Sequence, residues 1–290
     1  MNHDAQDQLD WLSQALSQEV FTHSQLSHAG GFSLEDAAEP GGIAPEGTAS
    51  LEHAQAARIE IRPDPAREKR KGVPEVIFGE TKTTAQVLSM ARSLLEGTGR
   101  AIVSRVRPET LAALREEFQN YTLRVREEAR ALVIYQPGYE PARTGGRVGV
   151  LSAGTSDVPV AEEAALIAEE MGCEVTCVYD VGVAGLHRLL EPLRALLSNG
   201  VDVMIVAAGM DGALPSVVAG LVPVPVIGLP TSVGYGLGGR GVAALLSMLQ
   251  TCAPGLSVVN IDNGIGAGST AALIANRVAL AADYRQRQGK

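Results

Sequence analysis

The sequence predicts an α/β fold in which a parallel sheet is covered by helices on both faces. In residues 145–290, five apolar strand-like segments alternate with five helix-like segments, and each strand-like segment ends in small or turn-forming residues. Continuous apolar runs are typical of strands that are buried on both faces, as in parallel sheets. We therefore expect this half to form a three-layer α/β/α domain with a parallel five-stranded core sheet.

The predicted strands and helices follow one another in a regular order. The strand-like segments are "RVGVLSAG" (147–154), "CEVTCVYDVG" (173–182), "VDVMIVAAG" (201–209), "VPVIGLPTS" (224–232) and "LSVVNID" (256–262). The helix-like segments cover residues 158–172, 184–200, 213–222, 241–252 and 268–287. Pro159 stands in the first turn of its helix, where the N–H that proline lacks would be unpaired in any case.

The first half predicts a smaller α/β domain over residues 55–140. Its apolar segments "PEVIFG", "RAIVSRV" and "ALVIYQP" are separated by helices that we expect at 83–96 and 108–118. The Pro- and Gly-rich stretch at 136–146 links this domain to the second half. Residues 1–54 predict an amphipathic helix at 6–19 and a flexible linker, rich in Gly, Pro, Ala and acid, at 29–50.

Composition excludes several classes of partner. The formal net charge of −9 and the aromatic content of 4% argue against nucleic acid, and the charge also argues against an anionic membrane surface. The polar N-terminus lacks the basic start and apolar core of a signal peptide, and no segment approaches the roughly 20 apolar residues of a spanning helix. The three cysteines form no framework and the five histidines are scattered, so we expect a cytoplasmic protein without a zinc site.

Ligand-binding residues are expected where the strands end. In open parallel sheets the ligand lies beyond the carboxyl ends of the strands, near the switch in strand order. The turns there, "SAGTSD", "YDVG", "AAGMDG", "PTSVGYG" and "NIDNG", combine small residues with hydroxyls and carboxylates. Together with exposed helix N-termini they predict a site for a small anionic ligand. A basic segment at 62–82 either faces a phosphate or is a solvated charge run.

Cys252 raises the question of whether a thiol reacts at this rim. It closes the apolar helix predicted at 241–252 and precedes a proline, a glycine and a strand. A free cysteine is often only a small buried hydrophobe. Cys173 and Cys177, four residues apart in a strand-like segment, fit that packing role.

The second half resembles PurE, the aminoimidazole ribonucleotide carboxylase or mutase, at "AGTSDVPVAEEAA", "AAGMDGALPSVVAGL", "PVIGLPTSVGYG" and "TCAPGLSVVNIDNGIGAG". From about residue 55 to 280 the chain is more similar to LarB, the pyridinium-3,5-dicarboxylate mononucleotide synthase that begins nickel-pincer cofactor assembly. LarB joins a PurE-like domain to an N-terminal domain with the motif DxxRxxRxGxPEVIxGxxKT. Here the motif comprises Asp64, Arg67, Arg70, Gly72, the "PEVI" from Pro74, Gly79, Lys82 and Thr83.

One departure separates the chain from PurE, and a second concerns LarB. The PurE turn "AGGAAHLPG" carries a catalytic histidine, whereas the matching turn here, "AGMDGALPS", has Ala213 in its place. LarB instead uses a cysteine in the stretch that Cys252 occupies and an acid, often glutamate, in the glycine turn, which here is Asp211. Asp211 is equally suited to proton transfer and to capping the helix that follows, and one residue can do both.

The resemblance implies an enzyme that carboxylates nicotinic acid adenine dinucleotide at C5 of its pyridinium ring and hydrolyses its phosphoanhydride, which releases AMP. Cys252 would be the covalent nucleophile and Asp211 the base. Carbon dioxide or bicarbonate would be the co-substrate, with no organic cofactor, and assistance by Mg²⁺ stays open. A homo-oligomer is expected, an octamer by analogy with PurE. The alternatives are a PurE-type mutase and a non-catalytic nucleotide-binding module.

The resemblance also assigns a set of binding residues. The rim residues expected to line the substrate pocket are Ser152, Gly154, Thr155, Ser156, Asp157, Asp180, Gly209, Met210, Thr231, Ser232, Tyr235, Asn260, Asp262 and Asn263. The first-half residues expected to hold the pyrophosphate or AMP half are Asp64, Arg67, Arg70, Lys82 and Arg105. Asp157 and Asp180 are alternatively helix caps, and Asp262 is alternatively a turn former.

Overall fold

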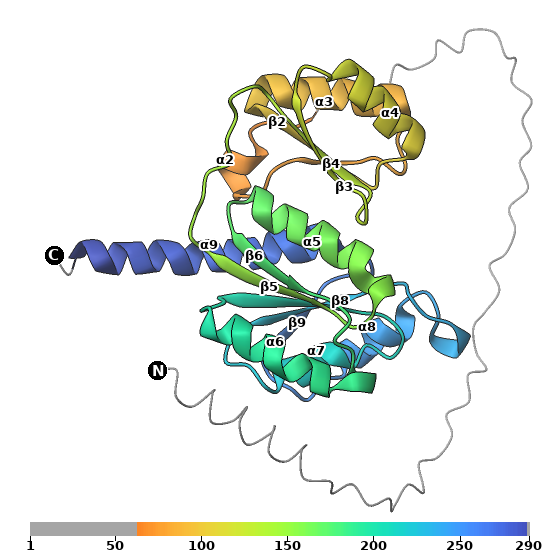
Figure 1. Cartoon of the computed structure of the whole chain (residues 1–290), viewed down its shortest axis with the longest axis vertical. Coiled ribbons are helices and arrows are strands. Elements are labelled where there is room, and N and C mark those ends of the chain that lie inside the picture. The colour runs from red at the N-terminus through yellow and green to blue at the C-terminus, as the bar shows by residue number, and fades with distance from the viewer. Residues whose placement is uncertain (1–62, 289–290) are drawn as a thin grey trace, which may run out of the picture.

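A computed structural model describes residues 63–288 of the chain. The helix expected at 6–19 and the linker expected at 29–50 lie outside these residues. The described chain contains a four-stranded and a five-stranded sheet, which occupy the upper and lower parts of the molecule in Figure 1.

The first domain is a mixed sheet with two helices on one face. Its elements, in chain order, are α2 (Arg67–Lys71), β1 (Val76–Phe78), α3 (Thr84–Thr98), β2 (Arg100–Ser104), α4 (Pro108–Glu117), β3 (Thr122–Arg126) and β4 (Ala131–Tyr135). The strand order is β1-β2-β4-β3, in which β1 and β2 are parallel and the other neighbours are antiparallel. A capping box between Thr83 and Gln86 begins α3, and Gly99, in the left-handed region, ends it.

The strand β3 is absent from the sequence-based expectations. Its residues "TLRVR" alternate between apolar and charged side chains. Leu123 and Val125 pack against the apolar core under α3 and α4, whereas Arg124 and Arg126 form ion pairs with glutamates of another helix. From the sequence alone, a strand with arginines on one face looks like a solvated segment. The glutamates that pair with these arginines become apparent only in the structure.

The second domain confirms the predicted fold class. Its elements are β5 (Arg147–Ser152), η1 (Thr155–Asp157), α5 (Val158–Glu170), β6 (Glu174–Val178), η2 (Val183–Gly185), α6 (His187–Ser198), β7 (Val203–Ala208), α7 (Leu214–Ala219), β8 (Val226–Pro230), η3 (Gly236–Gly238), α8 (Val242–Leu249), β9 (Leu256–Val258) and α9 (Gly264–Gln288). All five strands are parallel, in the order β6-β5-β7-β8-β9. Helices α5 and α9 cover one face, and α6, α7 and α8 cover the other.

The strand order places a switch point between β5 and β7. The chain leaves β5 toward β6 on one side and later returns to β7 on the other side. The loops that follow the two strands therefore diverge, and a crevice opens at their carboxyl ends. This is the edge at which the sequence concentrates its hydroxyl and carboxylate residues.

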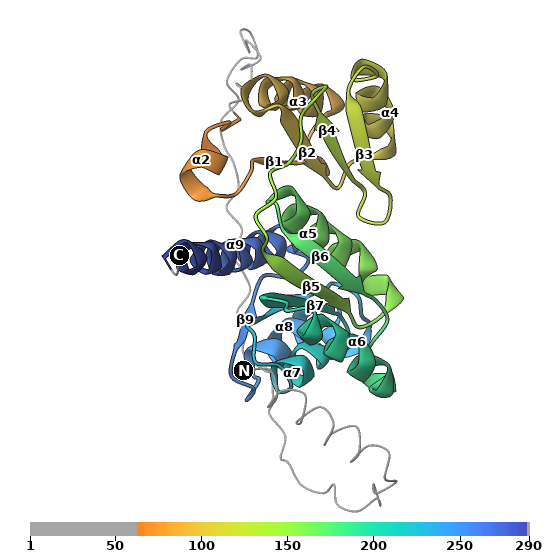
Figure 2. The ribbon, with the colours of Figure 1, turned by 60° about the vertical axis from the view of Figure 1, so that its left-hand side comes forward.

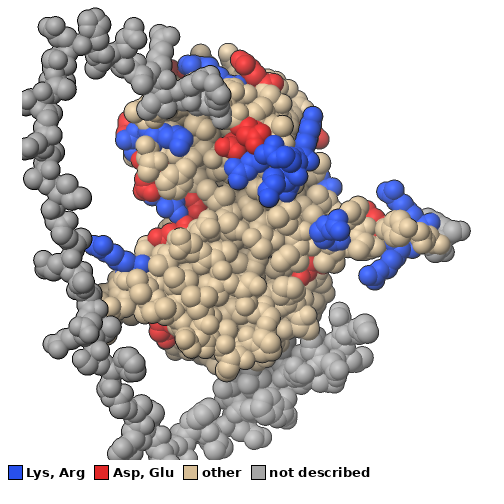
Figure 3. Space-filling view, turned by 180° about the vertical axis from the view of Figure 1, so that it is seen from behind, with Lys and Arg blue, Asp and Glu red and all other residues tan. Residues whose placement is uncertain are grey.

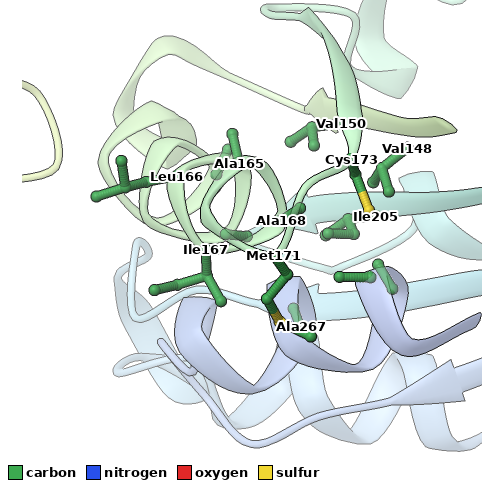
Figure 4. Packing of buried hydrophobic residues seen from close by; sticks show 14 of the residues in the cluster. Val148, Val150, Ala165, Leu166, Ile167, Ala168, Met171, Cys173, Ile205 and Ala267 are labelled. Atoms are coloured by element: carbon green, nitrogen blue, oxygen red, sulfur yellow. The ribbon is translucent and has the colours of Figure 1, made fainter. Parts of the chain in front are cut away.

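Helix α5 lies between the two sheets, so the domains share one core (Figure 2). Its small and branched residues pack on β5 and β7, and Figure 4 shows Ala165 and Ala168 beside Val150 and Ile205. A side chain in place of Gly268 would collide with the Ala164 carbonyl, so glycine allows α9 to approach α5 closely. The fold is therefore a stack of helices, sheet, α5 with α9, sheet and helices.

Cys173 is a packing residue, as expected. It is fully buried beside Val148 and Ile205 (Figure 4), and burial raises the pKa of its thiol to about 11. A thiol with a raised pKa is protonated near neutral pH and is a poor nucleophile. Cys177, within β6, is half-buried, and burial raises the pKa of its thiol as well.

Helix α9 corrects one expectation. Within the described residues it is the one helix that is long and apolar enough, by length and composition, to cross a membrane. Its first half packs Ala267, Ala271 and Ala275 into the core against α5. Core helices of soluble proteins pass the same length and composition test, so the observation is weak evidence for a membrane span.

Candidate active site

A cavity of about 300 Å³ lies at the switch point, at the carboxyl ends of β5, β6, β7 and β8. We call it the strand-end cavity. It is lined by Ala153, Gly154, Ser156, Asp157, Gly182, Val183, Ala184, Ala208, Gly209, Met210, Asp211, Ala213, Leu214 and Val233. Six residues of the predicted site are among them: Gly154, Ser156, Asp157, Gly209, Met210 and Asp211.

Asp157 places a buried carboxylate in this lining. Its side chain is 4% exposed. Its Oδ1 accepts a hydrogen bond from the Thr231 hydroxyl at 2.6 Å, and its Oδ2 accepts one from the Gly154 amide at 2.9 Å. Burial raises the pKa of the Asp157 carboxyl, and the hydrogen bonds oppose that shift. Thr231, itself fully buried, thus ties the loop after β8 to the loop after β5.

Ser152 and Asp180 organise the neighbouring loops and do not line the cavity. The buried Ser152 hydroxyl donates to the Gly154 carbonyl at 3.1 Å and accepts from the Asp180 amide at 3.2 Å. The Asp180 carboxylate forms an ion pair with Arg188 at 2.6 Å. Both residues therefore shape the rim through contacts within the chain.

The turn after β7 is pressed against the loop after β8. A side chain at Gly209 would collide with the Val233 carbonyl, which also accepts a 2.7 Å hydrogen bond from the Met210 amide. Asp211 follows with an exposed side chain, and its carboxylate accepts from the Ala213 amide at 3.4 Å. Ala213 is the N-cap residue of α7 and no side chain caps this helix, so the structural role of Asp211 narrows to an Asx turn ahead of α7 and a place in the cavity lining.

A second cavity of about 400 Å³ adjoins the first and lies between the two domains. We call it the interdomain cavity. It is lined by Glu80, Arg105, Ala129, Arg130, Ser156, Pro159, Val160, Glu163, Ser232, Val233 and Asp262. Ser156 and Val233 line both cavities, at the N-terminal end of α5. Arg105, Ser232 and Asp262 were predicted from the sequence, whereas Glu80, Arg130 and Glu163 were not.

Arg105 is held in place from three sides. Its Nη2 donates to the Asp262 carbonyl, and its Nε donates to Glu163 at 3.3 Å. Its guanidinium lies 5.0 Å from the centre of the Phe78 ring. Glu163 is in turn hydrogen-bonded by the Ser104 hydroxyl. The first domain thus presents a fixed cation at the edge of the second domain's site.

Strained backbone is concentrated around the two cavities. Among the described non-glycine residues, six have positive φ, and four of these line a cavity: Arg105 at 50°, Arg130 at 48°, Met210 at 51° and Asp262 at 54°. Such conformations cost of order 1–3 kcal/mol each and cluster at functional sites. This feature supports the location of the site independently of the motifs.

The basic motif lies at the far end of α5. Arg70 pairs with Asp64 at 2.5 Å, which lowers the pKa of the Asp64 carboxyl, and Arg67 pairs with Glu75 at 2.7 Å. Figure 3 shows basic and acidic side chains gathered together over the first domain. Helix α2, which contains both arginines, is tied through Glu68 and Arg100 to the C-terminal end of α5, whose N-terminal end reaches the cavities.

The expected role of these arginines, to hold the pyrophosphate or AMP half of the substrate, stays a prediction, and the structure does not bring them to the strand-end cavity of their own chain. A helix the length of α5 spans about 20 Å, so the motif and the strand-end cavity are well apart. Lys82 is nearer to the interdomain cavity but does not line it, and its carbonyl accepts from Arg107 at 2.8 Å. Within the motif, Glu80 is the residue that lines the interdomain cavity.

Cys252 lies at the opposite edge of the sheet from the strand-end cavity. Helix α8 ends at Leu249, three residues earlier than predicted, and Cys252 stands exposed in the turn before β9. The Gly255 carbonyl of that turn accepts from the Val226 amide at the amino end of β8. A strand as long as β8 spans about 16 Å, so the predicted convergence of Cys252 and Asp211 within one chain is wrong. Each crossover helix returns the chain to the amino edge, and a residue after the helix stays there.

The remaining predicted residues do not line either cavity. Thr155 is exposed in η1, and Tyr235 is 82% exposed beyond β8. The Asn263 side chain accepts from the Gly266 amide at 2.9 Å and caps α9, while the Asn260 side chain accepts from the Ile261 amide. Within the described residues, no group of three or more His, Cys, Asp or Glu side chains has the arrangement of a metal site.

Comparison with known proteins agrees with this two-domain architecture. The family described as AIR carboxylase matches residues 147–289, and the LarB/PurE-like N-terminal domain matches residues 53–136. An uncharacterised protein of Methanocaldococcus jannaschii is 44% identical over 220 residues, which cover 74% of this chain and 84% of that protein.

Proteins similar to the second domain alone carry an enzyme's name. The N5-carboxyaminoimidazole ribonucleotide mutase of Pyrococcus abyssi is 35% identical over 44% of this chain and 71% of the mutase. The enzyme of the same name from Mycobacterium tuberculosis (strain H37Rv) is 34% identical over 51% of this chain and 81% of the mutase.

The fold and the cavities define a PurE-type parallel α/β enzyme domain to which a second domain is fastened along one helix. The chain belongs to the LarB family, with a LarB-type N-terminal domain and a PurE-like C-terminal domain. The relatives of the second domain are named as carboxylase- and mutase-type enzymes, and this family membership supports an enzyme.

Proposed function

We propose that the protein carboxylates nicotinic acid adenine dinucleotide at C5 of the pyridinium ring and hydrolyses its phosphoanhydride. The products are pyridinium-3,5-dicarboxylate mononucleotide and AMP. The observation that carries the proposal is the union of the two domains: the LarB-type domain extends Arg105 and Arg130 to a cavity that adjoins the strand-end cavity. None of the described residues lining either cavity is a histidine, so the site lacks the group that PurE chemistry uses.

The proposed chemistry needs a thiolate because a pyridinium ring is electron-poor. Addition of the thiolate to a ring carbon neutralises the positive charge and leaves an enamine, whose β-carbon C5 attacks carbon dioxide and forms the new C–C bond. A base then takes the C5 proton, the electron pair restores the ring, and the thiolate leaves. Water cleaves the phosphoanhydride in a separate step. The reaction as written consumes carbon dioxide and water and uses no organic cofactor.

We propose that Cys252 serves the strand-end cavity of a second copy of the chain. The outer face of α8 carries Val242, Leu246 and Leu249, which are 49%, 55% and 60% exposed, while its inner face packs Ala244 and Met248. A helix that is apolar on all sides is typical of a buried helix. Figure 3 shows that the second domain also presents a broad surface with few charged residues. A homo-oligomer would cover α8 and bring the adjacent Cys252 to another copy.

Asp211 is the base in this proposal, because its carboxylate is exposed at the cavity wall. Asp157 is the other carboxylate in the lining, but its oxygens are engaged by Thr231 and Gly154. Its role is to hold the loops after β5 and β8 at a fixed separation. The Cys252 thiol, exposed in a turn, is accessible to a partner in a way that the buried Cys173 is not.

Product analysis tests the proposal directly. The full chain is incubated with nicotinic acid adenine dinucleotide and isotopically labelled bicarbonate, and mass spectrometry follows AMP and the dicarboxylated mononucleotide. A parallel reaction with N5-carboxyaminoimidazole ribonucleotide tests the activity named for the relatives of the second domain. Labelled dicarboxylate supports the proposal. Isomerisation of the ribonucleotide without labelled dicarboxylate would replace it by a mutase.

A further inference from the structure

The interdomain cavity contains two arginines of very different rigidity. Arg105 is fixed by the Asp262 carbonyl, Glu163 and the Phe78 ring. Arg130 lies in the turn between β3 and β4, and its side chain is 56% exposed. Both residues line the same cavity. Arg105 directly follows β2 and Arg130 directly precedes β4, so a strand anchors the backbone of each.

Glu80 stands between the two arginines and is only loosely bound. Its carboxylate lies 3.6 Å from Nη1 of Arg105 and 3.5 Å from Nη2 of Arg130. Charge-assisted hydrogen bonds between a guanidinium and a carboxylate are normally about 2.7–2.9 Å long. Glu80 is also 45% exposed, and ion pairs of this kind contribute little to stability. An anion with more oxygens and more charge can displace it.

The other carboxylates of the cavity are already engaged. Glu163 accepts from Ser104 and Arg105, and the Asp262 carboxylate accepts from the Ser232 amide at 2.8 Å. Among the described residues, the ion pair of Arg105 Nη1 is the long contact with Glu80. Displacement of Glu80 therefore leaves two guanidinium groups facing the cavity, with the Ser156 and Ser232 side chains in its wall.

We propose that the interdomain cavity is a phosphate-binding subsite in which Arg105 and Arg130 hold the ligand and Glu80 occupies their place in its absence. The identity of the ligand, the phosphate of the AMP half of a dinucleotide, rests on the proposed function. The binding itself does not, because it follows from the two arginines and the displaceable carboxylate. Ser156 and Val233 connect this subsite to the strand-end cavity, so one extended ligand can occupy both.

Equilibrium binding of AMP to the full chain tests the subsite without any chemistry. Glu80→Gln removes the competing charge and should tighten AMP binding about three- to tenfold. Arg130→Ala removes a charge-assisted contact and should weaken it by about tenfold or more. Adenosine, which lacks the phosphate, serves as the second probe and should bind all variants equally.

The exposed pair of Arg92 and Glu117, 2.7 Å apart on the opposite face of the first domain, supplies matched controls. Arg92→Ala and Glu117→Gln change the same charges and should leave AMP binding unchanged. Circular dichroism confirms the fold of each variant. AMP affinity within twofold of wild type for both Glu80→Gln and Arg130→Ala overturns the subsite, as does an equal change for adenosine.

The outcome is separable from that of the proposed function. If the dinucleotide is not carboxylated but AMP shows the expected pattern, the subsite stands and the reaction falls. If labelled dicarboxylate forms and AMP binding ignores Glu80 and Arg130, the reaction stands and the subsite falls.

Discussion

The strand-end cavity and the face between the two domains are formed by different kinds of residue. The cavity is made of backbone turns with small residues, in which Gly209 and Gly182 allow loops to approach closely. The interdomain face is made of long charged side chains from both domains. Backbone geometry therefore determines the shape of the cavity. Ion pairs determine how the first domain is oriented relative to it.

Four glutamates of α5 form the interdomain face. Arg126 pairs with Glu162 and Glu169, and Arg100 with Glu170 at 2.9 Å; Arg105 pairs with Glu163 at 3.3 Å. Removal of one partner from a buried pair is strongly destabilising, although the intact pair adds little net stability. The network therefore specifies how the first domain sits on α5, and with it where Arg105 meets the interdomain cavity.

The largest expected effect is the loss of product formation when the Cys252 thiol is removed, although one chain does not bring this thiol to its own strand-end cavity. Cys252→Ser should lower dicarboxylate formation by at least about three orders of magnitude, because an alkoxide is scarce near neutral pH and leaves poorly. Cys173→Ser and Cys177→Ser are the controls and should retain turnover. Liquid chromatography of the labelled product measures all three variants.

A mixing experiment sharpens this prediction. Cys252→Ser and Asp211→Asn should each be inactive alone. If Cys252 acts on the cavity of a second copy, refolding the two variants together should restore turnover, since mixed oligomers contain sites with both residues. Absence of any restored activity in verified mixed oligomers would contradict action between copies.

The second prediction compares a buried ion pair between the two domains with an exposed ion pair of the first domain. Glu170→Ala leaves the guanidinium of Arg100, which is 3% exposed, without its buried partner and should lower the free energy of unfolding by about 3–5 kcal/mol. Glu117→Ala breaks the exposed pair with Arg92 and should cost no more than about 1 kcal/mol. Urea unfolding measures both, and equal losses would show that the interdomain network has no special role.

A third prediction uses the raised pKa of Asp157. An acid with a higher pKa in the folded state binds more protons folded than unfolded over the interval above 3.8. Stability from this group is thus fully present below pH 3.8 and is lost as the pH rises through the folded pKa. Relative to Asp157→Asn, the wild type should lose free energy of unfolding as the pH rises through this interval. A difference that is constant with pH would remove burial as the controlling influence on Asp157.

The smallest effect is expected at the basic motif. Arg70→Ala breaks the exposed pair with Asp64 and should change stability by less than about 1 kcal/mol. Affinity for nicotinic acid adenine dinucleotide should stay within about twofold, since the pair lies at the far end of α5. Isothermal titration measures it, with Arg130→Ala as the sensitive comparison. A tenfold loss for Arg70→Ala would mean that another copy brings this motif to a bound ligand.

The sequence by itself determined the second domain and the position of its cavity. Strands buried on both faces are apolar throughout, so their periodicity and terminal turns are visible without knowledge of their neighbours. The turns "SAGTSD" and "AAGMDG" follow directly from those strands, and the structure places Asp157, Gly209 and Asp211 in the cavity lining.

Only the tertiary structure decided which distant residues meet. β3 was invisible because Arg124 and Arg126 face glutamates of α5, about 40 residues later in the chain. Cys252 has the thiol and Arg70 the charge that the proposed reaction needs. Cys252 nevertheless lies the length of β8 from the strand-end cavity, and Arg70 lies the length of α5 from it. Arg130, in the turn between β3 and β4, and Glu80, in the loop after β1, both line the interdomain cavity, although neither was predicted from the sequence. The role of a charged side chain depends on the residue that it contacts. When that residue is distant in the sequence, only the packed structure shows the contact.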